Sequence, residues 1–184
     1  MVKKDKMPEL AGRATCILGI DPGLDGGLAL LLAGCGHNGY ERMLIAKMPV
    51  REEIVSRKKR RYVADASLAE LIKGWNKTYP ISAIHLENVH ASSQMGVSSA
   101  FSFGRTFGCI VGCISGMGLR PKLQFVEPSV WKRKLLLSAN KKDAVAMAKK
   151  NWPTVKFGSH DGMAEAALIA LYGLEHAPEV DPLS

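Results

Sequence analysis

The stretch CILGIDPG, residues 16–23, decides the fold, because an apolar run ends there in an acid and then a sharp turn. The run before Asp21 has the length and composition of a buried strand. A carboxylate is among the side chains that a protein core least accommodates. Asp21 is therefore expected to face a ligand from the rigid end of a strand, and initiation of a turn is the alternative for this residue alone.

Three further acids occupy similar positions. Glu87 ends the apolar run of residues 81–87, and Asp161 and Glu165 lie one helical turn apart at the start of an apolar helix. Each has an ordinary alternative: a surface ion pair for Glu87, a helix cap for Asp161 and a solvated helix position for Glu165. Together, however, four acids at the ends of core elements favour one common explanation.

That explanation is a divalent metal. Converging carboxylates repel one another unless a cation is present, and oxygen-only ligation suits Mg²⁺ or Mn²⁺. Two such ions about 4 Å apart can activate a water and stabilise the leaving oxygen of a phosphodiester.

The order of elements predicts a mixed sheet. Strands at 15–21, 27–33 and 41–49 are joined by short turns and should form an antiparallel meander, whereas strands at 81–87 and 122–126 follow helical crossovers. Residues 50–62 are polar, and their basic run suits a solvated loop or a nucleic-acid contact. The expected helices are one capped by Ser67 and Glu70, and those at 99–118, 129–137, 141–152 and 162–175.

Size and charge suit one nucleic-acid-binding domain. The 184 residues divide into a basic tail at 1–13, a domain at 14–176 and a C-terminal tail at 177–184. The net charge of +8 indicates a polyanionic partner. An actin-like ATPase or sugar kinase needs two lobes and a second phosphate turn, for which the chain is too short.

The four cysteines lack the spacing of a zinc site and suggest a reducing compartment. No signal peptide is evident, and no apolar run approaches the roughly 18 residues that span a bilayer.

Glycines recur every fourth residue at 104, 108, 112 and 116, on one face of the expected helix 99–118. Because each costs about 1 kcal/mol of helix stability, the stripe indicates close approach of another backbone. That backbone belongs either to the protein's own sheet or to a second subunit.

Several motifs resemble those of RuvC-type Holliday junction resolvases. They are ILGIDPG at 17–23, HLENVH at 85–90 and HDGMAEAALIA at 160–170. The segments at 96–108 and 127–133 are similar to those of the branch carried by bacteriophages and prophages. The resemblance implies an RNase H-like (retroviral-integrase-like) α/β fold with a central five-stranded mixed sheet.

The resemblance also implies a function. It is that of a homodimeric endonuclease that binds a four-way DNA junction and nicks two opposed strands with Mg²⁺ or Mn²⁺. Such an enzyme acts in recombination and repair, in the cytoplasm of a bacterial or phage-infected cell. The metal-binding acids would be Asp21, Glu87, Asp161 and Glu165, and Lys142, rather than Lys141, would reach the scissile phosphate. The family places its dimer interface on the helix after Glu87, which favours the intersubunit explanation of the glycines.

Two positions depart from the family pattern. The last two acids are four residues apart instead of three, so His160 is an alternative to Asp161 as a metal ligand. His90 stands where a bulky aromatic often helps to open the junction. The residues expected to contact DNA are Arg57, Lys58, Lys59, Arg60, Arg61, His90, Arg105, Lys132, Arg133 and Lys141. The alternatives are a flap, debranching or RNA–DNA hybrid nuclease and a junction-binding protein without catalysis.

Overall fold

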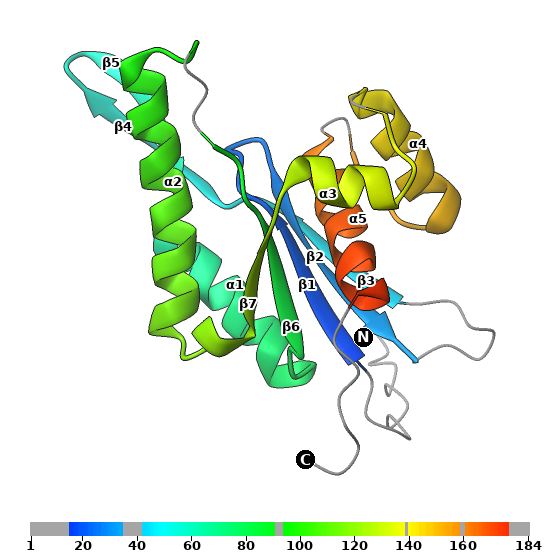
Figure 1. Ribbon diagram of the computed structural model, residues 1–184. Coiled ribbons are helices and arrows are strands. Elements are labelled where there is room, and N and C mark those ends of the chain that lie inside the picture. The colour runs from blue at the N-terminus through cyan, green and yellow to red at the C-terminus, as the bar shows by residue number, and fades with distance from the viewer. Residues whose placement is uncertain (1–14, 35–41, 91–93, 139, 159–160, 177–184) are drawn as a thin grey trace, which may run out of the picture.

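The computed structural model describes residues 15–34, 42–90, 94–138, 140–158 and 161–176. The expected tails and His160 lie outside these ranges. Five strands form the main sheet in the order β3-β2-β1-β6-β7 (Figure 1). Their bounds are β1 Thr15–Asp21, β2 Gly27–Ala33, β3 Arg42–Lys47, β6 Ala83–Glu87 and β7 Leu123–Val126.

Strand pairing confirms the predicted mixed sheet. β1 pairs antiparallel with β2, and β2 with β3, as expected for strands joined by short connections. β6 lies parallel to β1, and β7 parallel to β6. The crossovers that lead to these two strands contain α1 (Asp65–Thr78) and α2 (Val97–Gly116). β7 is preceded by a short 3-10 helix, Arg120–Lys122.

Helices cover both faces of the sheet. α1 and α2 lie on one side, and α3 (Pro128–Lys134), α4 (Lys141–Asn151) and α5 (Gly162–Glu175) on the other (Figure 1). β1 contributes side chains to the hydrophobic core on both faces of the sheet, because alternate side chains of a strand point to opposite faces. Leu18 and Ile20 join the core under α1 and α2, while Ile17 joins the core under α5.

Close packing of α5 on β1 depends on glycine. A Cβ atom on Gly19 would lie 2.1 Å from the carbonyl oxygen of Ala166 and 2.5 Å from the nitrogen of Ala170. Any larger residue at position 19 would therefore push α5 away from β1. This contact fixes the position of the helix that carries Glu165.

The polar segment after β3 is a hairpin, whereas a solvated loop was one of the two alternatives for its basic run and no strand was predicted there. β4 (Val50–Val55) and β5 (Lys58–Val63) form a separate two-stranded antiparallel sheet. Ser56 and Arg57 have φ of 50° and 62°. Two successive positive φ angles are the signature of a type I′ turn, whose twist matches that of the strands. The sequence lacks the usual Asn-Gly at this turn and gave no signal for it.

The expected capping box at Ser67 and Glu70 is also wrong. α1 begins at Asp65, with Ala64 at the N-cap and no side-chain cap, so Ser67 lies within the helix. In the described ranges, Cys16 is buried, Cys109 and Cys113 are partly buried, and none of the three is in a disulfide.

α2 presents its glycines outward. Its buried residues are Thr106, Ile110 and Ile114. A Cβ at any of the four striped glycines would meet no atom within 4 Å beyond the helix itself, so packing on the protein's own sheet does not explain them. α2 is also long and apolar enough to cross a membrane by length and composition alone, contrary to the expectation from the sequence. Such a helix is weak evidence for a membrane, because core helices pass the same test.

Candidate active site

Two of the four predicted acids end neighbouring parallel strands. Ile20 of β1 pairs with Leu86 of β6, so that Asp21 and Glu87, the next residues, lie side by side at the same edge of the sheet. Glu87 is only 7% exposed. Carboxyl ends of parallel strands are the usual location of sites in α/β sheets, and the two acids occupy that location.

The Asp21 side chain is held by the turn that follows it. Its Oδ1 accepts a hydrogen bond of 3.0 Å from the backbone N–H of Gly23. The pKa of Asp21 is raised from its ordinary 3.8 to about 7. Burial is the largest cause and the charges of Glu87 and Glu165 add to it, while the Gly23 hydrogen bond and the charge of Lys141 act in the opposite direction. The turn interpretation is thus correct for the backbone, yet it does not account for a buried carboxyl beside two others.

Trp131 orients Glu87. Its indole Nε1 donates to Glu87 Oε1 at 2.9 Å, and the ring is fully buried in α3. Burial raises the pKa of Glu87, and Glu165 adds to the effect, whereas the Trp131 bond and the charges of Lys132 and Lys141 lower it. The sequence motif contained Trp131, but no pattern indicated that its indole would hold an acid.

The other two acids come from the start of α5. Gly26, in the turn after Asp21, forms a bridge with Gly162, and a Cβ on Gly162 would lie 2.4 Å from the Cα of Gly26. This contact brings the first turn of α5 next to the end of β1. Glu165 is only 5% exposed, and its charge raises the pKa values of both Asp21 and Glu87.

Two lysines pair with these acids. Lys132 Nζ lies 2.9 Å from Glu165 Oε1, and Lys141 Nζ lies 2.8 Å from Asp161 Oδ2. Asp161 occupies the N-cap position of α5 without a side-chain capping bond, so capping does not explain its side chain. The hydrogen bond and charge of Asp161 raise the pKa of Lys141, and Glu165 and Asp21 add to this.

The positions of the two adjacent lysines are the reverse of what their predicted roles suggest, and the roles themselves stay predictions. Lys141, expected to contact DNA, has its ammonium group among the acids. Lys142, the predicted catalytic lysine, is exposed and donates its backbone N–H to the Asn140 side chain that caps α4. Lys132, likewise expected on DNA, points to Glu165 instead.

The donor chemistry of the site suits a hard divalent cation, because the candidate ligands are all carboxylates and two of them have raised pKa values. As the side chains stand, no group of three or more His, Cys, Asp or Glu residues in the described ranges is arranged to hold a metal ion. The ammonium groups of Lys132 and Lys141 now contact two of the four acids. Metal binding through all four acids would therefore require those two ion pairs to open.

A second polar cluster lies just beyond Glu87. Glu127 Oε1 accepts a hydrogen bond of 2.7 Å from Asn88 Nδ2 and lies 3.0 Å from His90 Nε2. These bonds lower the pKa of Glu127. His90 remains largely exposed, so its ring is oriented by Glu127 at the surface, next to the acids.

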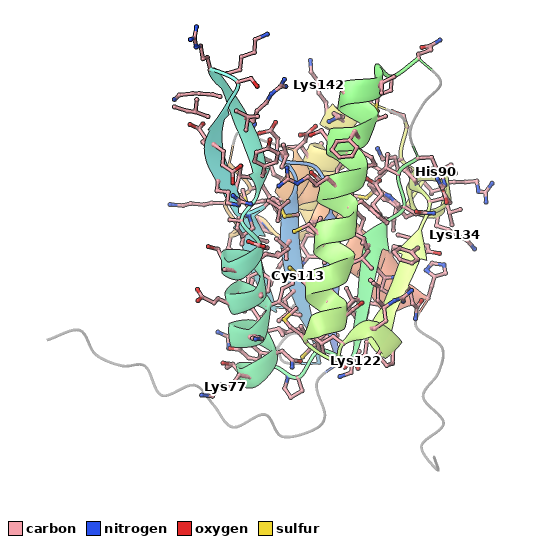
Figure 2. All side chains as sticks on the ribbon, turned by 90° about the vertical axis from the view of Figure 1, so that its left-hand side faces the viewer. Lys77, His90, Cys113, Lys122, Lys134 and Lys142 are labelled. Atoms are coloured by element: carbon pink, nitrogen blue, oxygen red, sulfur yellow. The ribbon has the colours of Figure 1, made fainter. Side chains whose placement is uncertain are left out.

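Five of the ten predicted DNA contacts, Arg57 to Arg61, lie on the hairpin. Figure 2 looks onto the face formed by α1, α2 and the hairpin, where basic side chains of β5 extend into solvent. Arg61 is different, because its guanidinium contacts Asp25 Oδ1 at 2.8 Å and the carbonyl of Leu24 at 3.0 Å. Arg105 of α2 lies 4.0 Å over the ring of Tyr62 and so fastens the hairpin to α2. Arg133 is exposed on α3.

Comparisons with known proteins identify the fold. No model of a known protein family matches the chain, and no curated protein matches it. The chain nevertheless has the RNase H-like fold of the solved RuvC structures, with a mixed five-stranded central sheet flanked by helices. Thermus thermophilus RuvC in complex with Holliday junction substrate aligns with a TM-score of 0.58 and 17% identity over 87% of this chain and 93% of that one. A second structure of Thermus thermophilus RuvC aligns with a TM-score of 0.57, also at 17% identity, over 88% and 96% of the two chains.

Proposed function

We propose that this protein is a RuvC-type, metal-dependent endonuclease that resolves four-way DNA junctions by paired symmetric nicks, leaving 5′-phosphate and 3′-hydroxyl ends. One observation carries the proposal: on a RuvC-like fold, Glu165 lies close enough to Asp21 and Glu87 for its charge to raise the pKa of both. Burial and the charge of Glu165 raise the pKa values of Asp21 and Glu87, and raised carboxyl pKa values of this kind are typical of functional sites.

Asp21, Glu87, Asp161 and Glu165 would hold one or two Mg²⁺ or Mn²⁺ ions, which when bound supply an activated water and stabilise the leaving oxygen of the phosphodiester. The chain's own residues prepare the ligands. The Gly23 N–H fixes Asp21 Oδ1, and the Trp131 indole fixes Glu87 Oε1, so neither carboxylate is free to rotate. Preorganised ligands of this kind keep the geometry of a metal site precise.

The partner in this proposal is branched DNA bound by a homodimer. The net charge of +8 and the basic hairpin support a polyanionic ligand. The outward glycine stripe on α2 supports a second copy of the chain as the surface that covers this helix. α2 also carries Arg105 and packs on α1 and β5, which favours a subunit interface over a lipid bilayer. Recombination or repair in the cytoplasm of a bacterial or phage-infected cell is the setting we propose.

The direct test incubates the purified protein with a synthetic four-way junction and Mg²⁺ or Mn²⁺. Paired symmetric nicks are expected, and they should disappear in Asp21→Asn, which keeps an oxygen for the Gly23 hydrogen bond. Glu70→Gln is the matched control, since it neutralises an exposed acid of α1. Cleavage that continues unchanged in Asp21→Asn would refute the assignment of the site.

The rival functions give different results in the same assay. A flap or debranching nuclease, or an RNA–DNA hybrid nuclease, would prefer a flap, a Y-form or a hybrid over the four-way junction. A junction-binding protein without catalysis would bind the junction in EDTA but show no metal-dependent turnover. Comparison of these substrates at equal concentration distinguishes the three possibilities.

A further inference from the structure

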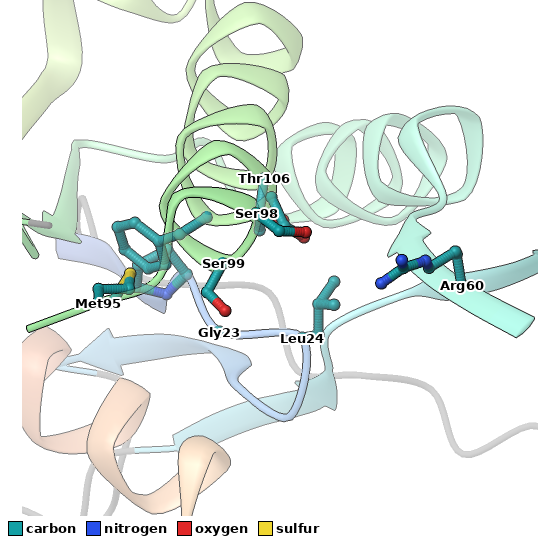
Figure 3. Close-up of a pocket in the computed structure, with 10 residues that line it drawn as sticks. Gly23, Leu24, Arg60, Met95, Ser98, Ser99 and Thr106 are labelled. Carbon is teal, nitrogen blue, oxygen red and sulfur yellow. The ribbon is translucent and has the colours of Figure 1, made fainter. Parts of the chain in front are cut away.

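A hollow of about 380 Å³ lies directly behind the turn that carries Asp21. One wall is Gly23 and Leu24 of that turn, and the opposite wall is the beginning of α2. Arg60 of β5 closes a third side, and Figure 3 shows its side chain extending from the hairpin toward Leu24. The volume falls within the roughly 300–1,000 Å³ of ordinary ligand pockets.

The lining suits an anion that carries an apolar part. Arg60 supplies a guanidinium, and Ser98, Ser99 and Ser102 supply hydroxyl groups that can donate hydrogen bonds to phosphate oxygens. Phe103 and Met95 supply an aromatic ring and a polarisable thioether, against which a base can stack. None of the described residues that line the hollow is acidic.

The Arg60 side chain is available for such a ligand. Its cross-strand neighbour is Glu53, and Glu53 forms an ion pair with Arg51. Within the described ranges, the ion pairs of the hairpin use Arg51, Lys59 and Arg61, and none involves Arg60. Arg61, the next residue, holds the hairpin against Leu24 and Asp25, so that Arg60 is fixed at the edge of the hollow.

We propose that this hollow binds one nucleotide of the DNA strand next to the phosphate that is cut, with its phosphate on Arg60 and the serines and its base against Phe103. The proposal rests on the proposed nuclease function and adds a subsite to it. Proximity supports it, because Gly23 both lines the hollow and holds Asp21 Oδ1 through its N–H. A nucleotide seated there would be withdrawn from base stacking and would fix the position of its neighbour at the acids.

The test uses the full chain and a four-way junction in EDTA, with 2-aminopurine placed in turn at each position flanking the mapped cleavage site. Fluorescence of this base rises when it leaves the stack. We compare Arg60→Gln with Ser99→Phe, which fills the hollow from an exposed position without changing charge. Arg42→Gln is the control, because it removes the same charge from an exposed position of β3 that neither lines the hollow nor belongs to the predicted DNA contacts.

The wild-type protein and Arg42→Gln are expected to show a rise at one position adjacent to the cut. Arg60→Gln and Ser99→Phe should lose that rise and lower kcat/KM in Mg²⁺ about tenfold, the size of a lost base stack. Ser99→Phe should do so with an unchanged salt dependence of binding.

Two results would overturn the subsite alone: cleavage by the wild-type protein with no local rise at any position, or a rise and turnover in both variants equal to those of Arg42→Gln. A wild-type protein that neither binds nor cuts the junction would overturn the nuclease function as well. Circular dichroism and thermal unfolding of each variant establish that it is folded.

Discussion

Neutralising Asp21 should abolish cleavage and yet stabilise the metal-free protein. The pKa of Asp21 rises from 3.8 to about 7 because the carboxyl is buried beside two other acids. Between these values the folded state holds a proton that the unfolded state has lost, so stability falls as pH rises across that window. The full penalty above pH 7 is about 4 kcal/mol, and about 3 kcal/mol of it accrues between pH 5 and pH 8.

Asp21→Asn removes this penalty and keeps an acceptor for Gly23. Urea unfolding of both proteins in EDTA at pH 5 and pH 8 should show a stability advantage of the variant that grows by up to about 3 kcal/mol toward the higher pH. Added Mg²⁺ should stabilise the wild-type protein more than the variant, since ligand bound only to the folded state raises its stability. An advantage that stays constant or shrinks as pH rises would refute the reasoning, and Glu70→Gln should show no comparable trend.

Three further predictions concern the lysines and the glycine stripe. Lys132→Met should destabilise the metal-free protein by about 3 kcal/mol, because Glu165 is left buried without its partner, and the double change with Glu165→Gln should recover most of that loss in urea unfolding. Lys141→Met should move the pH profile of cleavage upward, since its charge lowers the pKa of the acids, whereas Lys142→Met should leave the profile in place; equal profiles would contradict the assignment. Gly112→Leu should convert a dimer to monomer in analytical ultracentrifugation without unfolding the chain, because a Cβ at this position meets no atom of the protomer.

The sheet was predictable because its signals are local. The apolar runs and the short turns between the first strands set the meander, and the lengths of the later crossovers required parallel strands. The ends of β1 and β6 follow from where their apolar runs stop, so Asp21 and Glu87 could be placed on neighbouring strand ends from the sequence. Glu165 could be placed from the apolar surroundings that it interrupts.

The hairpin and the lysine contacts were not predictable by the same means. β4 and β5 carry charged side chains on most positions. These strands therefore lack the alternation of apolar and polar residues that normally identifies a strand in a sequence. Which of Lys141 and Lys142 lies near the acids depends on the direction in which each side chain points from the first turn of α4. The spacing of residues in the sequence does not specify that direction. Trp131 lies in the core, and its single polar atom reaches Glu87 only through the packing of α3 on the sheet, which no sequence pattern indicated.

The short turn after Asp21 connects every part of the proposed mechanism. Gly23 holds the Asp21 carboxylate, and Gly26 bridges to Gly162 at the start of the helix that carries the last two acids. Arg61 contacts the same turn from the hairpin, through Asp25 and the carbonyl before it. Arg61 therefore connects the hairpin to the turn that lies between β1 and the start of α5. Arg61 is thus better understood as an anchor of the hairpin than as one of the predicted phosphate contacts.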